Sequence, residues 1–313
     1  MKKIIILIVI LLAVNLSATK YAGEIFRMGA GVRNYALGSC GVSDEFSFAL
    51  AYWNSALLSR VSENKFELMH AEEYSGLLTY DMASAIWGTE NKFSVVITRI
   101  GIDDIPLTKL TDPTDSLYYA NRPYKYKSVN NSDIVIYFGL SRNIGKYVIG
   151  ITPKFAYRSL AEESGYGFGA DISTFLELNR NLFLGLKIRD FFSTQILWAN
   201  GTHEIVNPGF DAELNYQFVF PVLKRNSRFF VGTEFYTESR DTASQFALGF
   251  LSMDYHLGCE INMHKAVDLY LGYDVKNFTG GLSINHRNWK INYSFEQNSE
   301  LENSHRVSIG YKI

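Results

Sequence analysis

The side chains best suited to catalysis or metal binding are few in this chain and do not cluster. Cys40 and Cys259 stand far apart with no CxxC or Cys/His spacing, so neither a disulfide framework nor a zinc site is predicted. The six histidines are scattered, at positions 70, 203, 256, 264, 286 and 305. No GxSxG, HExxH or Walker sequence occurs, and the GxG at Gly29 and Gly31 lacks the preceding strand and third glycine of a dinucleotide site. We therefore expect no enzyme activity, no bound metal and no cofactor.

The composition excludes several other classes of protein. The chain has 313 residues and a net charge of −2, so no basic excess is available for nucleic acid, and we expect no nucleic-acid partner. It is 47% hydrophobic, which excludes disorder. It carries 20 Tyr, 22 Phe and 4 Trp, yet its mean hydropathy is only −0.04. The fold must therefore place many aromatic side chains beside many polar ones.

The first 18 residues have the features of a secretory signal peptide. Lys2 and Lys3 precede an apolar run over residues 4–14, and Ala18 supplies a small residue at the cleavage position. The run is too short to span a bilayer as a helix. We predict export with cleavage after Ala18; an uncleaved anchor is the alternative.

From about residue 64 onward, apolar and polar residues alternate with a period of two, which is typical of strands with one apolar and one wet face. Residues 288–296 show this clearly, and the longest segments could cross a bilayer as tilted strands. Fourteen strands are predicted, at 64–71, 75–87, 91–100, 132–141, 146–158, 166–178, 181–190, 206–220, 228–237, 253–263, 266–274, 277–286, 288–296 and 303–313. Residues 242–250 also alternate loosely and could shift the count by two.

The predicted connections favour a transmembrane antiparallel β-barrel over a water-soluble fold. Those after even-numbered strands are short, whereas the longest, 101–131, 191–205 and 238–252, all follow odd-numbered strands. Short turns at one end and long loops at the other are typical of barrels in the bacterial outer membrane, where we expect this chain. A periplasmic sandwich or propeller is the alternative, but its strands are usually shorter, and no propeller repeat is found.

The polar face of the predicted strands would line the barrel interior with charges of both signs. These residues are Asp171, Glu177, Lys187, Arg189, Asp211, Glu213, Glu234, Asp254, Glu260, Asp268, Lys290, Glu296, Arg306 and Lys312. Buried charges must be paired or hydrated. Either a network of structural ion pairs or a polar conduit would satisfy this requirement. Cys259 falls on the opposite, lipid-facing side.

Residues 19–63 break the alternation and carry a glycine-rich pattern. It reads AGEIFRMGAGVR from Ala22, LGSCG from Leu37 and YWNSAL from Tyr52. This pattern resembles the opening of the PorV/PorQ family of outer-membrane proteins, relatives of the FadL-type transport barrels. The matching residues are Ala22, Gly23, Phe26, Arg27, Gly29, Gly31, Arg33, Gly38, Gly41, Tyr52, Trp53, Asn54, Ala56 and Leu57. Ser55 departs from the family, which has proline there, and similarity resumes within residues 293–311.

The resemblance implies a FadL-like barrel of about 14 strands with a short, partly helical, plug-like N-terminal segment. The domains would then be a signal peptide (1–18), a plug or periplasmic segment (19–63) and the barrel (64–313). Asn54 would lie at the turn of a short helix that enters the first strand. The glycines of the pattern would let backbone pack closely within the barrel mouth.

Two functions follow from the resemblance, and the sequence does not choose between them. The first is association with type IX protein secretion, in which extracellular loops hold secreted cargo at the outer membrane. The candidate docking residues lie in the 101–131 connection and are Asp103, Asp104, Tyr118, Tyr119, Tyr124 and Tyr126. The alternative is a FadL-like channel for hydrophobic small molecules, with a movable plug and a lateral gap between strands. Expected partners are outer-membrane lipid and either secreted proteins or hydrophobic small molecules.

Overall fold

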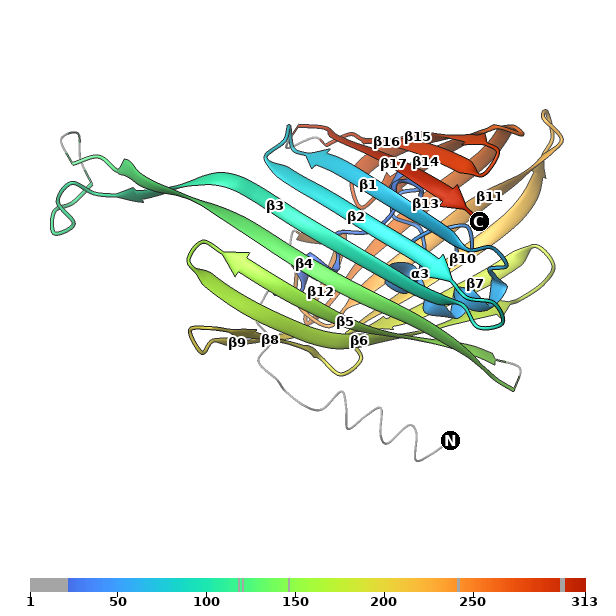
Figure 1. The fold of residues 1–313 in the computed structure, drawn as a ribbon, viewed down its shortest axis with the longest axis horizontal. Coiled ribbons are helices and arrows are strands. Elements are labelled where there is room, and N and C mark those ends of the chain that lie inside the picture. Colours follow the sequence, from blue (N-terminus) through green and yellow to red (C-terminus); the bar gives the residue numbers. More distant parts are fainter. Residues whose placement is uncertain (1–21, 118, 120, 146, 241–242, 299–301) are drawn as a thin grey trace.

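The computed structural model describes residues 22–117, 119, 121–145, 147–240, 243–298 and 302–313; the predicted signal peptide and Tyr118 lie outside them. An antiparallel sheet closes on itself as a barrel, because β1 pairs with β17 (Figure 1). The predicted fourteen-stranded wall is confirmed. Its strands are β1 (Lys65–Glu73), β2 (Leu78–Trp87), β3 (Phe93–Lys109), β4 (Tyr124–Ile144), β5 (Tyr147–Leu160), β6 (Glu163–Glu177), β7 (Leu182–Arg189), β10 (Gly209–Phe220), β11 (Arg225–Tyr236), β13 (Leu251–His264), β14 (Val267–Asp274), β15 (Asn277–His286), β16 (Trp289–Glu296) and β17 (Ser304–Lys312).

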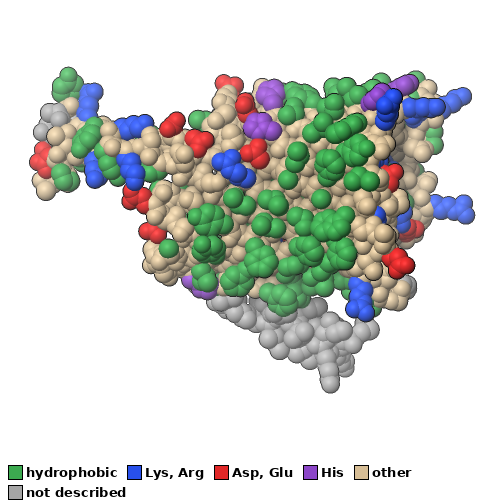
Figure 2. Space-filling model, viewed as in Figure 1, with side chains coloured by type: hydrophobic (Ala, Val, Ile, Leu, Met, Phe, Trp, Pro, Cys, Tyr) green, Lys and Arg blue, Asp and Glu red, His purple; other side chains and the backbone are tan. Residues whose placement is uncertain are grey.

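The wall is apolar outside and polar inside, the reverse of a water-soluble barrel. In β1, burial alternates along the whole strand: inward Glu67 is 2% exposed, whereas outward Leu68 is 54% exposed. On the face shown in Figure 2, hydrophobic side chains gather over the barrel wall. An exposed apolar wall of this extent requires lipid around it. The alternative of a water-soluble sandwich or propeller is therefore wrong.

The two ends of the barrel differ as predicted. The connections after β2, β4, β6, β10, β13 and β15 are short, and we name that end the short-turn end. The opposite end carries the longest connections, residues 110–123, 190–208 and 237–250, and is named the long-loop end.

Three parts of the long-loop end differ from the sequence prediction. Residues 101–131 are mostly a strand extension rather than a loop, because β3 and β4 continue as a paired hairpin that projects from the barrel (Figure 1). The connection after β7 contains a small hairpin of β8 (Thr194–Trp198) and β9 (His203–Val206), which extends the edge of β6. Of the predicted loose alternation over 242–250, the structure describes 243–250, where only β12 (Phe246–Leu248) is a strand. It pairs with the beginning of β13 and adds no wall strand, since β11 pairs with β13 directly.

Four short helices lie in residues 22–64, the described part of the chain before β1. They are η1 (Glu24–Phe26), α2 (Val32–Ala36), α3 (Leu50–Trp53) and η2 (Ser55–Arg60). Asn54 caps η2 by accepting a hydrogen bond from the Ala56 N–H at 3.0 Å, the position predicted for it. No helix in the described ranges is long and apolar enough to span a membrane.

Candidate functional site: the plugged lumen

Residues 22–60, which we name the N-terminal segment, lie inside the barrel. Most of their side chains are buried, and the apolar ones pack in a cluster that also includes wall residues such as Tyr80 and Tyr137. The segment also bonds to inward-facing groups on strands all round the wall. These groups belong to Tyr80 in β2, Ser94 in β3, Thr152 in β5, Thr174 in β6, Lys187 in β7, Glu213 in β10, Glu260 in β13, Tyr270 in β14 and Thr279 in β15. The segment therefore fills the lumen as a plug.

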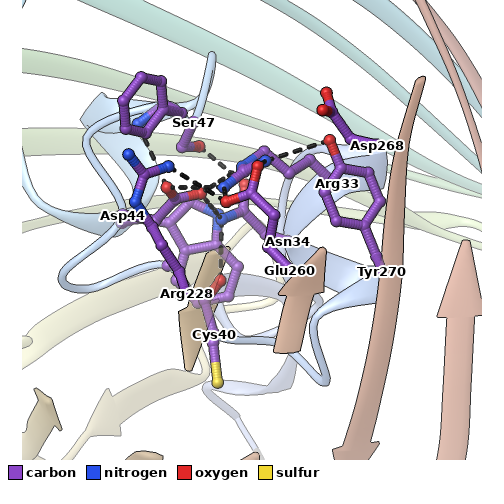
Figure 3. Close-up of polar contacts among 12 residues, drawn as sticks. Arg33, Asn34, Cys40, Asp44, Ser47, Arg228, Glu260, Asp268 and Tyr270 are labelled. Carbon is purple, nitrogen blue, oxygen red and sulfur yellow. Dashed lines mark hydrogen bonds and ion pairs between the residues drawn. The ribbon is translucent and has the colours of Figure 1, made fainter. Parts of the chain in front are cut away.

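Arg33, from the glycine-rich pattern, is the main charged link between plug and wall (Figure 3). Its guanidinium donates to Asp44 at 2.7 and 3.2 Å within the plug, and to Glu260 of β13 at 3.0 and 2.8 Å. Its Nη1 also donates to the Tyr270 hydroxyl at 3.1 Å. Arg33, Asp44 and Glu260 are all buried, so each charge depends on these partners. The position of Arg33 is thus fixed on both the plug and the wall.

A second link joins Glu213 of β10 to consecutive backbone amides of the plug. Its carboxylate accepts hydrogen bonds from the N–H groups of Gly41, Val42 and Ser43, at 2.8, 3.2 and 2.8 Å, and from the Ser43 hydroxyl at 2.6 Å. A buried carboxylate without a cationic partner can be held by several N–H donors in this way. Glu213 lay on the predicted interior face, but its role as a backbone anchor was not predicted.

Glycines on both sides bring the plug backbone directly against the wall. Gly38 has φ +66°, and a Cβ there would overlap the backbone of Leu257 and Tyr273. On the wall, a Cβ at Gly185 would overlap the Val42 carbonyl. No side chain fits between the two surfaces at these points, so the predicted close packing by pattern glycines is confirmed at Gly38.

The other pattern residues divide into two groups along the lumen. The first group, Trp53 and Asn54, lies near the middle of the plug. The Trp53 side chain donates to the Ala30 carbonyl at 2.7 Å and packs on Gly41. The Asn54 side chain donates to the carbonyls of Val42 and Thr174 at 2.7 and 3.0 Å. The other group lies towards the long-loop end and consists of Gly23, Phe26, Arg27 and Gly29, with Gly31 leading into α2.

Most of the inward-facing wall charges form ion pairs, which is one of the two predicted alternatives, whereas Glu213 and Asp254 are held by hydrogen bonds. In one cluster, Lys154 contacts Asp171 and Asp190 at 2.8 and 2.7 Å, and Lys187 contacts Asp171 at 3.0 Å. Lys154 and Asp190 were not selected from the sequence, although alternation along β5 places Lys154 inward. Two predicted lumen residues, Glu177 and Lys312, are instead partly exposed at the short-turn end, where Glu177 pairs with Arg60.

A polar cavity of about 210 Å³ remains between plug and wall near the long-loop end. It is lined by Glu24, Arg27, Gly29, Ser39, Tyr52, Trp53, Glu234, Tyr236, Arg240, Ala243, Asp254, His256, Asp274 and Val275. Two reciprocal ion pairs border it: Arg27 with Glu238 at 3.1 Å, and Arg240 with Glu24 at 3.0 Å. These pairs tie the start of the plug to the β11–β12 connection.

A larger, apolar groove of about 420 Å³ lies in the outer wall at β5, β6, β7 and β10. It is lined by Ile144, Tyr147, Ile149, Ile172, Ser173, Thr174, Leu176, Leu186, Lys187, Ile188 and Phe210. The wall is weakly paired beside it. β6 pairs with β7 only over residues 172–177 and with β8 only over residues 165–168. Between these stretches the Phe191 N–H bonds the Ala170 carbonyl at 2.8 Å.

The candidate docking residues lie on the projecting β3–β4 hairpin, remote from the plug (Figure 1). Asp103 and Asp104 are exposed near its base, while Tyr119, Tyr124 and Tyr126 are 84%, 51% and 44% exposed further out. At its tip, hydrogen bonds from the Thr114 hydroxyl and N–H lower the pKa of Asp112. The predicted residues are thus brought together on one protrusion, Tyr118 aside.

Comparisons with known proteins find similarity in structure but not in sequence. No protein-family model matches the chain, and no curated protein matches it. The Ralstonia pickettii toluene transporter TbuX matches with a TM-score of 0.55 at 9% identity. The deltaS2S3 mutant of the monoaromatic hydrocarbon channel TodX matches at 0.57 and 10%, and Pseudomonas putida TodX itself at 0.52 and 11%. Each match covers 91% of this chain and 98% of the other. At such identities the likeness establishes the fold, which is a FadL-like outer-membrane β-barrel; nothing in the comparisons supports the narrower PorV/PorQ resemblance.

Proposed function

We propose that this chain is a passive outer-membrane channel for hydrophobic small molecules, with the N-terminal segment as its plug. The proposal is carried by the filled lumen, where charged groups such as Lys154 and Glu260 are buried in ion pairs. Separating such buried pairs costs free energy, and an apolar solute offers the charged groups no interaction that would offset this cost. It would therefore leave the lumen through the wall into the lipid. The fold likeness to hydrocarbon transporters supports the proposal, which involves no catalysis.

The apolar groove beside the β6–β7 pairing is the best candidate for that exit. Its walls are Ile172, Leu186, Ile188 and similar side chains, and the adjacent strand pairing is short. A concave apolar surface that opens towards the acyl chains suits a hydrocarbon. We take this groove as the place of the lateral gap that the FadL-like alternative predicts.

The test is a disulfide staple across this pairing. Thr174 and Leu186 are direct partners, so the Thr174→Cys/Leu186→Cys variant, in a Cys259→Ala background, should lock β6 to β7. Leu269→Cys/Leu282→Cys locks β14 to β15 as a matched control. Uptake of radiolabelled toluene and of a long-chain fatty acid is measured in cells that lack other hydrocarbon channels.

We expect the β6–β7 staple to remove most channel-dependent uptake, a reductant to restore it and the control staple to leave it unchanged. Unchanged uptake with the first staple would exclude this exit. Wild-type uptake no faster than in cells without the protein would exclude the channel function itself.

A second candidate function, the docking of secreted cargo, is favoured by the projecting hairpin. Exposed tyrosines such as Tyr119 and Tyr124 are typical of protein interfaces. Replacing residues 109–124 with an Asn-Gly turn shortens the hairpin without touching the plug. If the hairpin docks cargo, a secreted protein that co-purifies with the wild type should be lost from this variant, while hydrocarbon uptake is kept.

A further inference from the structure

The short-turn end of the barrel carries a ring of exposed, unpaired cations. Arg180, Lys224, Lys265 and Arg287 each lie in a short connection or at its edge, and Arg142 lies near the end of β4, next to a fifth. Within the described part of the chain, none of the five forms an ion pair, unlike Arg60, which pairs with Glu45 and Glu177. Lys and Arg side chains project from the end opposite the hairpin in Figure 2.

The long-loop end has the opposite character. Exposed carboxylates there include Glu72, Asp103, Asp104, Asp112, Asp115, Glu162, Glu163 and Glu302. The basic residues of the projecting hairpin offset them only in part, and Lys127 is paired with Glu162. The chain is nearly neutral as a whole, so this separation of charge is a property of the two ends.

Outward-facing aromatic residues locate the ring relative to the bilayer. Trp87, Tyr147 and Trp289 stand at the strand ends next to short turns and are 41%, 49% and 44% exposed. Trp289 packs on Tyr311 with ring centroids 4.6 Å apart. Such aromatic side chains lie at the membrane–water interface of barrels. The cations, at or just beyond the same strand ends, therefore lie at the depth of the lipid headgroups.

We propose that this ring binds the phosphates of anionic phospholipids in the leaflet at the short-turn end. Its cations are distributed over turns round the barrel, next to the lipid-facing wall, and not gathered in one patch. That distribution fits a surrounding annulus of headgroups better than a single acidic protein. The inference needs only insertion of the barrel in a bilayer and does not depend on channel activity.

The test measures the lipid preference of the annulus by tryptophan quenching. The folded barrel is placed in phosphatidylcholine vesicles that contain brominated phosphatidylglycerol or brominated phosphatidylcholine. Trp87 and Trp289, on the outer wall beside the ring, report the lipid bound there. We expect phosphatidylglycerol to be preferred about fivefold at low salt and the preference to fall as salt is raised.

Matched variants assign the preference to the ring. Replacing its five cations with Gln should bring the preference close to one. The single Arg142→Gln and Arg287→Gln variants should each lower it in part. The control replaces five cations of the long-loop side with Gln, at Arg99, Lys109, Arg122, Lys125 and Lys127, and should keep the preference. A wild-type ratio near one, or a preference that survives in the five-Gln ring variant, overturns the proposal. The first of these results would direct the search to an acidic protein partner.

Discussion

Replacing Arg33 with Met should release the plug while the barrel stays folded. The substitution keeps much of the side-chain length but removes the charge that joins Asp44 of the plug to Glu260 of the wall. Both carboxylates are buried, at 0% and 4% exposure, so neither can turn to bulk water. The plug then loses its main charged attachment to β13.

The expected size of the effect follows from the partners that remain. Removing one member of a buried ion pair typically costs about 3–5 kcal/mol. The lower figure applies here, because Glu260 keeps Arg228 at 3.1 Å and Asp44 keeps the Asn34 side chain at 3.3 Å. A loss of about 3 kcal/mol raises the fraction of opened plug by roughly a hundredfold.

Cys40 supplies the assay, because it is a fully buried thiol within the plug. In a Cys259→Ala background, the rate at which a water-soluble maleimide labels Cys40 reports how often the plug opens. We expect Arg33→Met to raise this rate about a hundredfold. Adding Asp44→Asn should recover part of the protection, since Glu260 still pairs with Arg228 and the plug then carries no unpaired carboxylate at residue 44.

The control removes a buried arginine that pairs only within the wall. Arg189 contacts Asp211 and Glu234 at 2.9 and 3.0 Å. Arg189→Met should lower the stability of the barrel with a much smaller effect on Cys40 labelling. If Arg33→Met labels no faster than this control, Arg33 does not hold the plug and the argument is refuted.

Three further predictions concern the wall and its packing. Unboiled protein should migrate differently from boiled protein on a detergent gel, since the closed barrel resists unfolding; identical migration would contradict the fold. Gly185→Ala should accelerate Cys40 labelling, because its Cβ would overlap the Val42 carbonyl, whereas Gly232→Ala, whose Cβ would have 3.5 Å of space, should not. Lys154→Met should lower the free energy of unfolding in urea by about 3 kcal/mol, because it leaves Asp190 without its cation. An unchanged urea midpoint would argue against a buried charge at Asp190.

The wall strands could be predicted from sequence because the membrane imposes their pattern. Each strand between lipid and lumen must alternate, so all fourteen segments were found, and Cys259 was placed correctly on the outer face. Outside the membrane this constraint ends. The hairpin beyond Ile105 is exposed on both faces and shows no alternation, and β8 and β9, of five and four residues, are too short to show a clear period of two.

The partners of the plug could not be predicted, for a different physical reason. Alternation shows that Glu213 and Glu260 face the lumen, but it does not show what fills the lumen at that height. Arg33 reaches a residue 227 positions away, and that pairing depends on how the plug folds. The pattern glycines were the best local indication, because a run of them is needed where two backbones touch.

Plug and wall together determine what a transport measurement can reveal. The plug backbone meets wall glycines such as Gly185 and Gly272, and its charges pair with the wall, so it cannot shift slightly to let a solute pass. Passage needs either release of the plug or an exit through the wall. Labelling of Cys40 during uptake separates the two routes. Transport with Cys40 protected requires an exit through the wall, for which the β6–β7 groove is the candidate, and transport that rises in step with labelling in Arg33→Met requires plug release. A β6–β7 staple should block the first route and leave the second open.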